Sequence, residues 1–178
     1  MSYVNYLEPF LRERRSLVIA CHDCDTIDLD QRANGVFVHT CLCSMVNLDD
    51  TSEVSLIRYF IEDLACDQVI LLGHTNCRAV KDILEMGRRH APLRRLQRVI
   101  TGAWTASACC IRHNMRIRIM TEQNIIHQVR AISTLPFVEE KINMKTLQVK
   151  GLCWDEASST FNEICRNNIV FNDIVSQG

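Results

Sequence analysis

The sequence predicts an α/β fold, with helices flanking a mostly parallel central sheet that carries an antiparallel strand at its edge. Short apolar runs alternate with segments of helical periodicity in the first half of the chain. The C-terminal part instead reads as strand, polar turn, strand over residues 146–164. A length of 178 residues fits one domain, residues 1–178, in which residues 1–15 form a short amphipathic helical arm.

The first half of the chain contains the parallel units. The apolar run SLVIAC, residues 16–21, predicts a buried strand, and GVFVHT, residues 35–40, predicts a second. Residues 52–66 have apolar side chains at helical spacing, and Ser52 is the expected N-cap of that helix. Residues 67–73, DQVILLG, are the clearest strand because they are rich in leucine and β-branched residues and end at a glycine.

The second half is expected to add helices to this sheet. A helix is predicted to begin near Thr75, another covers residues 122–132, and Pro136 starts a further segment. The region 88–133 is basic, and its RRHAPLRRLQRVI stretch is interpreted as a solvated helix face, because no aromatic residues interleave the charges as in a nucleic-acid-binding stripe.

Composition excludes several classes of partner. The net charge is −1 and there is no long uncharged apolar run, so neither a nucleic-acid partner nor a membrane is expected. The N-terminus does not have the pattern of a secretory signal, which favours a cytoplasmic protein whose ten cysteines are reduced thiols. Five of these cysteines lie among apolar neighbours and are predicted to fill the core: Cys66, Cys109, Cys110, Cys153 and Cys165.

Three metal-binding side chains follow the predicted strands. Cys21 ends the first strand, and His74 and Cys77 follow the strand at 67–73. Ligands of open parallel sheets collect beyond the carboxyl ends of the strands, so these residues converge if the two strands are neighbours. Two thiolates and one imidazole suit Zn²⁺, which leaves a fourth position open or available to Asp23.

These motifs resemble those of the β-class carbonic anhydrases, which have Cys-x-Asp-Ser-Arg after the first strand and Gly-His-x-x-Cys-Gly after the third. The present chain has CHDCD at residues 21–25 and GHTNCRAV at 73–80, and the resemblance extends from about residue 16 over nearly the whole chain. It implies a zinc-dependent lyase that reversibly hydrates CO2 to bicarbonate by attack of zinc-bound hydroxide. It further implies Cys21, His74 and Cys77 as metal ligands, Asp23 as a catalytic gate, and a homodimer or a multiple of dimers.

The chain departs from this family pattern at the gate. Cys24 stands at the position of the family's serine, and Asp25 at the position of its arginine, which in the family pairs with the aspartate and keeps it off the metal. Without that cation, the Asp23 carboxylate is expected to coordinate the zinc. The site would then be closed by two cysteines, one histidine and one aspartate, and activity would be weakened or altered.

Two further departures surround the same site. The family usually has Arg-Asn-Ala-Gly after the second strand, where this chain has TCLCS, so Cys41 or Cys43 is expected near Cys21 if the first two strands are adjacent. Filling of space is the alternative role for this pair. Arg78 replaces the glycine that follows the second cysteine ligand, and its guanidinium is a candidate substitute clamp for Asp23, with a solvent-facing side chain as the simpler alternative.

Three functions follow from these observations. The first is a carbonic anhydrase, and the second is a catalytically inactive zinc protein on the same fold with a structural or regulatory closed site. The third is a thiol redox protein that uses Cys21 and Cys24. It is disfavoured because the residues that follow do not read as a helix and because neighbouring carboxylates raise thiol pKa values.

Overall fold

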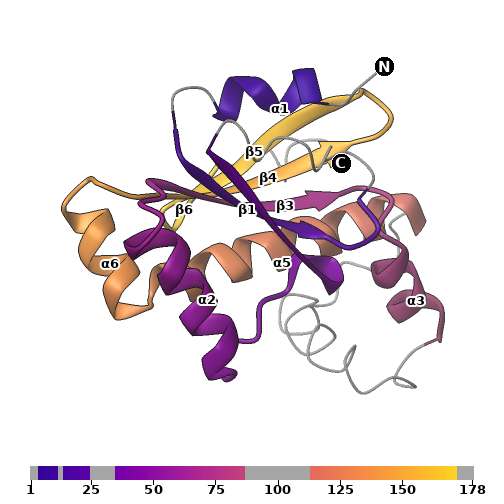
Figure 1. Ribbon diagram of the computed structural model, residues 1–178. Helices are drawn as coiled ribbons and strands as arrows, with labels where there is room; N and C mark the ends of the chain where they lie inside the picture. The colour runs from indigo at the N-terminus through magenta and orange to yellow at the C-terminus, as the bar shows by residue number, and fades with distance from the viewer. Residues whose placement is uncertain (1–3, 12–13, 25–34, 87–112, 172–178) are drawn as a thin grey trace.

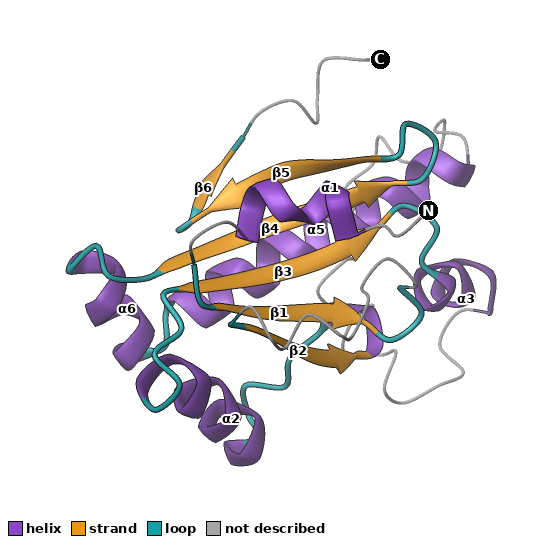
Figure 2. Ribbon diagram, turned by 45° about the horizontal axis from the view of Figure 1, so that its top comes forward, coloured by secondary structure: helices purple, strands orange, loops and turns teal. Residues whose placement is uncertain are grey.

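The computed structural model describes residues 4–11, 14–24, 35–86 and 113–171, and its centre is a six-stranded sheet (Figures 1 and 2). The strand order is β2-β1-β3-β4-β5-β6. The first four of these strands run parallel, and β5 and β6 are antiparallel to their neighbours. The strands are β1 (Ser16–Cys21), β2 (Val36–Cys41), β3 (Gln68–His74), β4 (Gln148–Asp155), β5 (Thr160–Arg166) and β6 (Ile169–Val170).

Helices cover both faces of the sheet (Figure 1). Two groups of buried residues alternate along the central strands: Leu17 and Ile19 of β1 belong to the core on one face, and Val18 and Ala20 to the core on the other. The first core is closed by α2 (Thr51–Glu62), α5 (His113–Ser133) and α6 (Pro136–Asn143), and the second by α1 (Val4–Leu11). Continuous apolar runs are needed at β1 and β3 because both of their faces are covered.

The long helix α5 lies very close to β3 and β4. A Cβ atom added at Gly73 would lie 2.7 Å from Thr121 Cγ2, and one added at Gly151 would lie 2.7 Å from Ile125 Cγ2 and 2.6 Å from Cys165 Sγ. These two glycines therefore allow the helix to approach the backbone of β3 and β4, and Gly73 does so next to His74 at the end of β3.

The expected fold class is confirmed, and the differences concern element boundaries. The helix expected over 52–66 is α2, which ends at Glu62, and its N-cap is Asp50 rather than Ser52, because the Asp50 side chain accepts a hydrogen bond from the Ser52 backbone N–H. The helix expected from near Thr75 begins at Arg78 as α3 (Arg78–Met86). The RRHAPLRRLQRVI stretch, Cys109 and Cys110 lie outside the described residues.

Candidate metal centre

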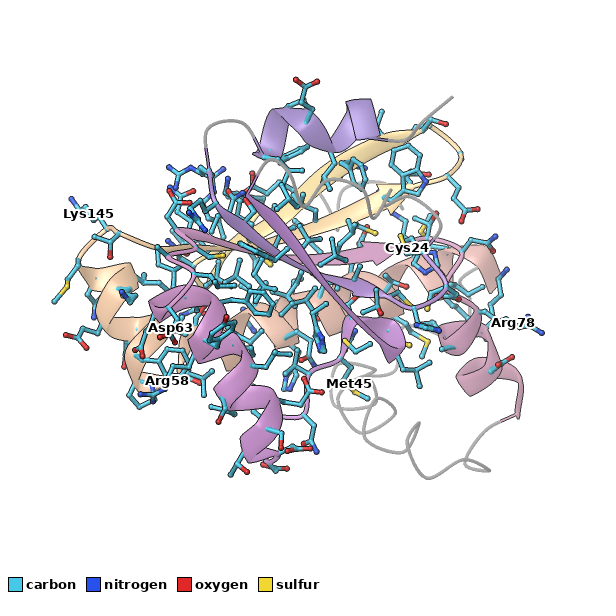
Figure 3. All side chains as sticks on the ribbon, in the orientation of Figure 1. Cys24, Met45, Arg58, Asp63, Arg78 and Lys145 are labelled. Carbon is cyan, nitrogen blue, oxygen red and sulfur yellow. The ribbon has the colours of Figure 1, made fainter. Side chains whose placement is uncertain are left out.

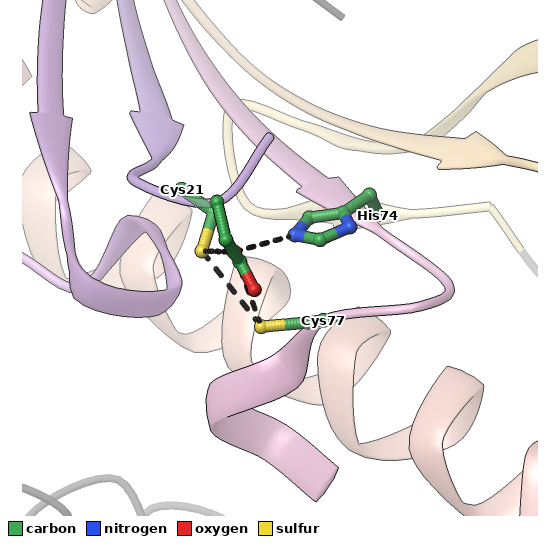
Figure 4. Close-up of side chains that lie close together, drawn as sticks. Cys21, His74 and Cys77 are labelled. Carbon is green, nitrogen blue, oxygen red and sulfur yellow. Dashed lines mark hydrogen bonds and ion pairs between the residues drawn. The ribbon is translucent and has the colours of Figure 1, made fainter. Parts of the chain in front are cut away.

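The site lies at the carboxyl ends of β1 and β3, which pair in parallel (Figure 4). Cys21 is the last residue of β1 and His74 is the last residue of β3. Cys77 precedes α3 and acts as its N-cap, because its carbonyl accepts the hydrogen bond from the Lys81 N–H. Strand pairing and the start of α3 therefore fix three donor side chains from two distant parts of the chain.

Four side chains converge at this point: Cys21, Asp23, His74 and Cys77 each place one donor atom within 4.8 Å of the others. The sulfurs of Cys21 and Cys77 lie 3.7 Å apart. Asp23 Oδ1 lies between them and the imidazole, 2.6 Å from Cys21 Sγ and 3.0 Å from His74 Nε2. Cys21, His74 and Cys77 are buried, whereas about a third of the Asp23 side chain is exposed.

The donor set fits a tetrahedral zinc ion. Two thiolates bound to one tetrahedral Zn²⁺ at about 2.3 Å each are about 3.8 Å apart, close to the observed separation of the Cys21 and Cys77 sulfurs. Two sulfurs, an imidazole nitrogen and a carboxylate oxygen are also the donor types that zinc accepts. Among the described residues, this is the group of histidine, cysteine and acidic side chains that could hold a metal ion.

Asp23 is held from its other side by the start of α3. The backbone N–H of Arg78 donates a hydrogen bond of 2.8 Å to Asp23 Oδ2. Arg78 is the first residue of α3, where the free N–H groups and the helix dipole favour an anion. Its side chain is exposed and points away from the site (Figure 3), so Arg78 contacts Asp23 through its main chain and not through the guanidinium considered as a clamp.

The other predicted pocket residues are placed unequally around this group. Cys43 is buried beside it: its backbone N–H donates to Cys21 Sγ at 3.2 Å, and its own sulfur lies 3.7 Å from Cys77 Sγ. Cys41 pairs with Cys21 across the β1–β2 ladder, but its half-buried side chain packs against the main core. Cys24 is half-buried, and its backbone N–H donates a hydrogen bond to the Cys21 carbonyl. Asp25 lies outside the described residues.

Contacts within the group shift the pKa values of its thiols. Hydrogen bonds from Cys43 and Cys77 lower the pKa of the Cys21 thiol far below its usual range. The same bonds to Cys21 raise the pKa of the Cys43 and Cys77 thiols, since each donates to the Cys21 thiolate. From the sequence, the neighbouring carboxylates predict a raised pKa for Cys21. That prediction is wrong because it did not include the two thiol donors, Cys43 and Cys77.

Contacts within the group also shift the pKa of the His74 imidazole. Burial lowers the pKa of His74, but hydrogen bonds to Cys21 and Cys77 outweigh burial and raise it to about 11. The Cys21 sulfur therefore favours a proton, and with it a positive charge, on His74. A divalent cation would replace that proton charge, because zinc binds the neutral imidazole and deprotonated thiols.

Two buried polar residues of α5 support the site and were missed in the sequence. Asn124 Nδ2 donates to the Cys43 carbonyl at 2.7 Å, and Gln128 Oε1 accepts from the Val46 N–H at 3.1 Å. Both bonds hold the turn η2 (Leu42–Ser44) and the loop after it against α5. The available signal was the occurrence of polar residues, four positions apart, on the apolar face of the helix expected over 122–132.

Comparisons with known proteins agree on one family. Residues 16–161 match the family model described as carbonic anhydrase. A carbonic anhydrase of Candida albicans is 22% identical over 156 residues; the match covers 84% of this chain and 56% of the relative, so the chain spans about half of that relative's length.

Solved structures of β-carbonic anhydrases have the same fold. CafD of Aspergillus fumigatus superimposes with a TM-score of 0.74 at 20% identity, over 88% of this chain and 94% of that chain. A tetrameric β-carbonic anhydrase of Sordaria macrospora gives a TM-score of 0.72 at 22% identity, over 86% and 82% of the two chains. At these identities the superpositions establish the fold.

Proposed function

Because the chain belongs to the carbonic anhydrase family, and to its β class, we propose that it binds Zn²⁺ and catalyses the reversible hydration of CO2 to bicarbonate. The proposed metal ligands are Cys21, His74 and Cys77, with Asp23 as the gate of the fourth position. The observation that carries the proposal is the convergence of these four donors at the ends of β1 and β3.

Zinc bound by this group would act as a Lewis acid and provide a nucleophile near neutral pH by lowering the pKa of bound water. Two thiolates donate more charge than imidazoles do, so an ion held here would be a weaker Lewis acid than one held by three histidines. His74 presents Nε2 to the group, so zinc would bind that nitrogen, and its Nδ1 lies on the side of Glu156, 3.9 Å from the carboxylate.

Asp23 controls access to the fourth position in this proposal. One carboxylate oxygen faces the three ligand side chains, and the other accepts the Arg78 N–H. In the family, an arginine side chain positions this aspartate. Here the backbone N–H at the start of α3 takes over part of that role. Turnover requires Asp23 Oδ1 to leave the ligand group, whereas the observed position favours the closed arrangement.

The closed position of Asp23 favours a second candidate function. If Asp23 stays on the metal at every pH, the chain is a zinc protein without turnover, in which the ion has a structural or regulatory role. The 2.6 Å contact of Asp23 Oδ1 with Cys21 and the 3.0 Å contact with His74 support this alternative.

Rates of CO2 hydration decide between the two functions. Zinc-loaded wild-type protein is assayed by stopped flow from mildly acidic to mildly alkaline pH, next to Asp23→Ala and next to the chelated protein. We expect a wild-type rate above the buffer and chelated controls that rises with pH. Stoichiometric zinc without any such rate, in the wild type and in Asp23→Ala alike, would support the inactive zinc protein and contradict the enzyme.

The cellular setting and assembly are part of the same proposal. We expect a cytoplasmic protein that forms a homodimer or a multiple of dimers and acts on CO2 and bicarbonate. The tetrameric assembly of the Sordaria macrospora relative supports an oligomer. Among the helices of the described ranges, none combines the length and apolar character needed to cross a membrane.

A further inference from the structure

A third thiol lies against the two ligand thiols. Cys43 is 4% exposed, its sulfur lies 3.7 Å from Cys77 Sγ, and its backbone N–H donates a hydrogen bond of 3.2 Å to the Cys21 sulfur. Two sulfurs bound to one tetrahedral zinc lie about 3.8 Å apart, so the Cys43–Cys77 separation fits shared coordination as well as the Cys21–Cys77 separation does. Cys43 thus contacts both ligand cysteines, Cys77 through its sulfur and Cys21 through its backbone N–H.

The turn that carries Cys43 is held in an unusual conformation. Cys43 and Ser44 both have left-handed φ values, 56° and 55°, which residues other than glycine seldom adopt. Two hydrogen bonds hold the turn in place: the Asn124 side chain donates to the Cys43 carbonyl, and the Ser44 hydroxyl donates to the Leu72 carbonyl. The surrounding structure therefore fixes a strained backbone that directs the Cys43 thiol and N–H toward Cys21 and Cys77.

We propose that Cys43 is a further ligand of the metal, which it binds together with Cys21, Cys77 and His74 by displacing Asp23. Cys43 lies beside the group of four donors rather than inside it, so it exchanges with Asp23 and does not add a fifth ligand. Sites of three cysteines and one histidine are closed zinc sites. The Cys43-bound form therefore has no position for water and holds the metal in a resting state.

This inference rests on the proposed function only for the identity of the metal and the site, and not for turnover. When Cys43 binds the metal, the Asp23 carboxylate still accepts the hydrogen bond from the Arg78 N–H at the start of α3 and is otherwise solvated. A partly exposed carboxylate at a helix N-terminus is stable there, so displacement leaves no buried unpaired charge.

X-ray absorption at the zinc edge counts the sulfur ligands directly, since Zn–S distances of about 2.3 Å separate from Zn–N and Zn–O distances of about 2.0–2.2 Å. We expect three sulfurs in the zinc-loaded wild type, three in Asp23→Ala and two in Cys43→Ser. In the cobalt-substituted proteins, Cys43→Ser should lose about a third of the sulfur-to-metal charge-transfer absorbance, as one of three thiolates is removed.

Two further variants separate ligation from folding. Cys43→Gly suits the left-handed backbone and should reproduce the loss of one sulfur if Cys43→Ser folds poorly. Cys66→Ser changes an equally buried thiol of the main core and should leave the sulfur count at three. Two sulfurs in the wild type, with no change in Cys43→Ser or Cys43→Gly, would overturn the inference. Because the count needs no turnover, CO2 hydration by a two-sulfur wild type leaves the proposed function intact, and a three-sulfur protein without turnover leaves the inference intact.

Discussion

Two groups of buried cysteines in this chain show how little residue type and burial alone reveal about chemistry. Cys21 and Cys77 of the metal centre are 2% and 1% exposed, and Cys153 and Cys165 of the main core are also 2% and 1% exposed. Cys153 and Cys165 pack with apolar side chains, whereas Cys21 and Cys77 face each other, Asp23 and another thiol. The difference lies in what each sulfur touches.

The electrostatic consequence is opposite for Cys21 and for the two core cysteines. Burial raises the pKa of Cys165 to about 12 and that of Cys153 further, since their surroundings cannot stabilise a thiolate. Burial acts on Cys21 too, but thiol hydrogen bonds outweigh it and lower its pKa. The contacts of the metal centre therefore favour a thiolate at Cys21, whereas the surroundings of Cys153 and Cys165 favour the protonated thiol.

The largest expected effect comes from changing one cysteine of each group to serine. Cys77→Ser removes a proposed zinc ligand but keeps a residue that caps helix α3 well. We expect zinc affinity to fall by more than the factor of about 10–100 that is typical for changes of outer-shell partners. Competition with a chromophoric chelator measures the affinity, and CO2 hydration should be lost with the metal.

The matched variant is Cys165→Ser, which should bind zinc with unchanged affinity. It should lower the free energy of unfolding by about 1–3 kcal/mol, because it buries a hydroxyl among apolar neighbours. Urea denaturation measures this change. If Cys165→Ser weakened zinc binding as much as Cys77→Ser, the division of the cysteines into two groups would be wrong.

The next effect compares two glycines against the same helix. Gly73→Ala and Gly151→Ala each force a Cβ atom within 3 Å of a side chain of α5, and each should destabilise the fold by about 1–3 kcal/mol. Gly73 immediately precedes His74, so Gly73→Ala should also weaken zinc binding. Thermal unfolding with and without zinc checks this: the stabilisation by zinc should shrink in Gly73→Ala and stay at the wild-type value in Gly151→Ala.

The convergence of the predicted ligand residues could be inferred from the sequence, because it follows mainly from strand topology. Apolar runs identify β1 and β3, and a parallel sheet brings their carboxyl ends together, so Cys21 and His74 meet without further information. Cys77 follows from its spacing to His74 at the start of a helix. The fold class follows from the same elements.

Main-chain interactions and boundaries could not be read in the same way. The hold on Asp23 comes from the backbone N–H of Arg78, which every residue type except proline has, so no side-chain pattern could indicate it. The approach of Cys43 depends on two consecutive left-handed residues, a conformation that a cysteine and a serine do not suggest. The cap at Asp50 was missed because Ser52 is an equally good N-cap by type.

A smaller effect tests the main-chain hold on Asp23. Arg78→Pro removes the N–H that Asp23 accepts, and proline is well tolerated at the first position of a helix. A hydrogen bond to a charged group contributes about 1.5–3 kcal/mol, and partial exposure of Asp23 places this one at the lower end. We expect the pH profile of CO2 hydration to shift in Arg78→Pro as Asp23 is repositioned.

Arg78→Ala is the control, because it keeps the N–H and removes only an exposed side chain that points away from the site. Its rate and pH profile should match the wild type. Equal shifts in Arg78→Ala and Arg78→Pro would instead assign the hold on Asp23 to the guanidinium.

The effect that is smallest near neutral pH is a pH dependence of stability that belongs to the core cysteine Cys165. The pKa of Cys165 is raised from its ordinary value of 9.0 to about 12 in the folded chain, so the unfolded chain loses this proton first as the pH rises. The stabilisation is complete below about pH 9 and is lost as the pH rises toward 12, with a slope of at most about 1.4 kcal/mol per pH unit for one proton.

Cys165→Ala isolates this contribution from the other groups that titrate at alkaline pH. The free energy of unfolding, measured with urea at a series of pH values between those limits, should fall less steeply in Cys165→Ala than in the wild type. Parallel curves would mean that the folded chain tolerates the Cys165 thiolate as well as the unfolded chain does. In that case the apolar surroundings of Cys165 would not separate it from Cys21, and the contrast between the two groups would reduce to metal binding alone.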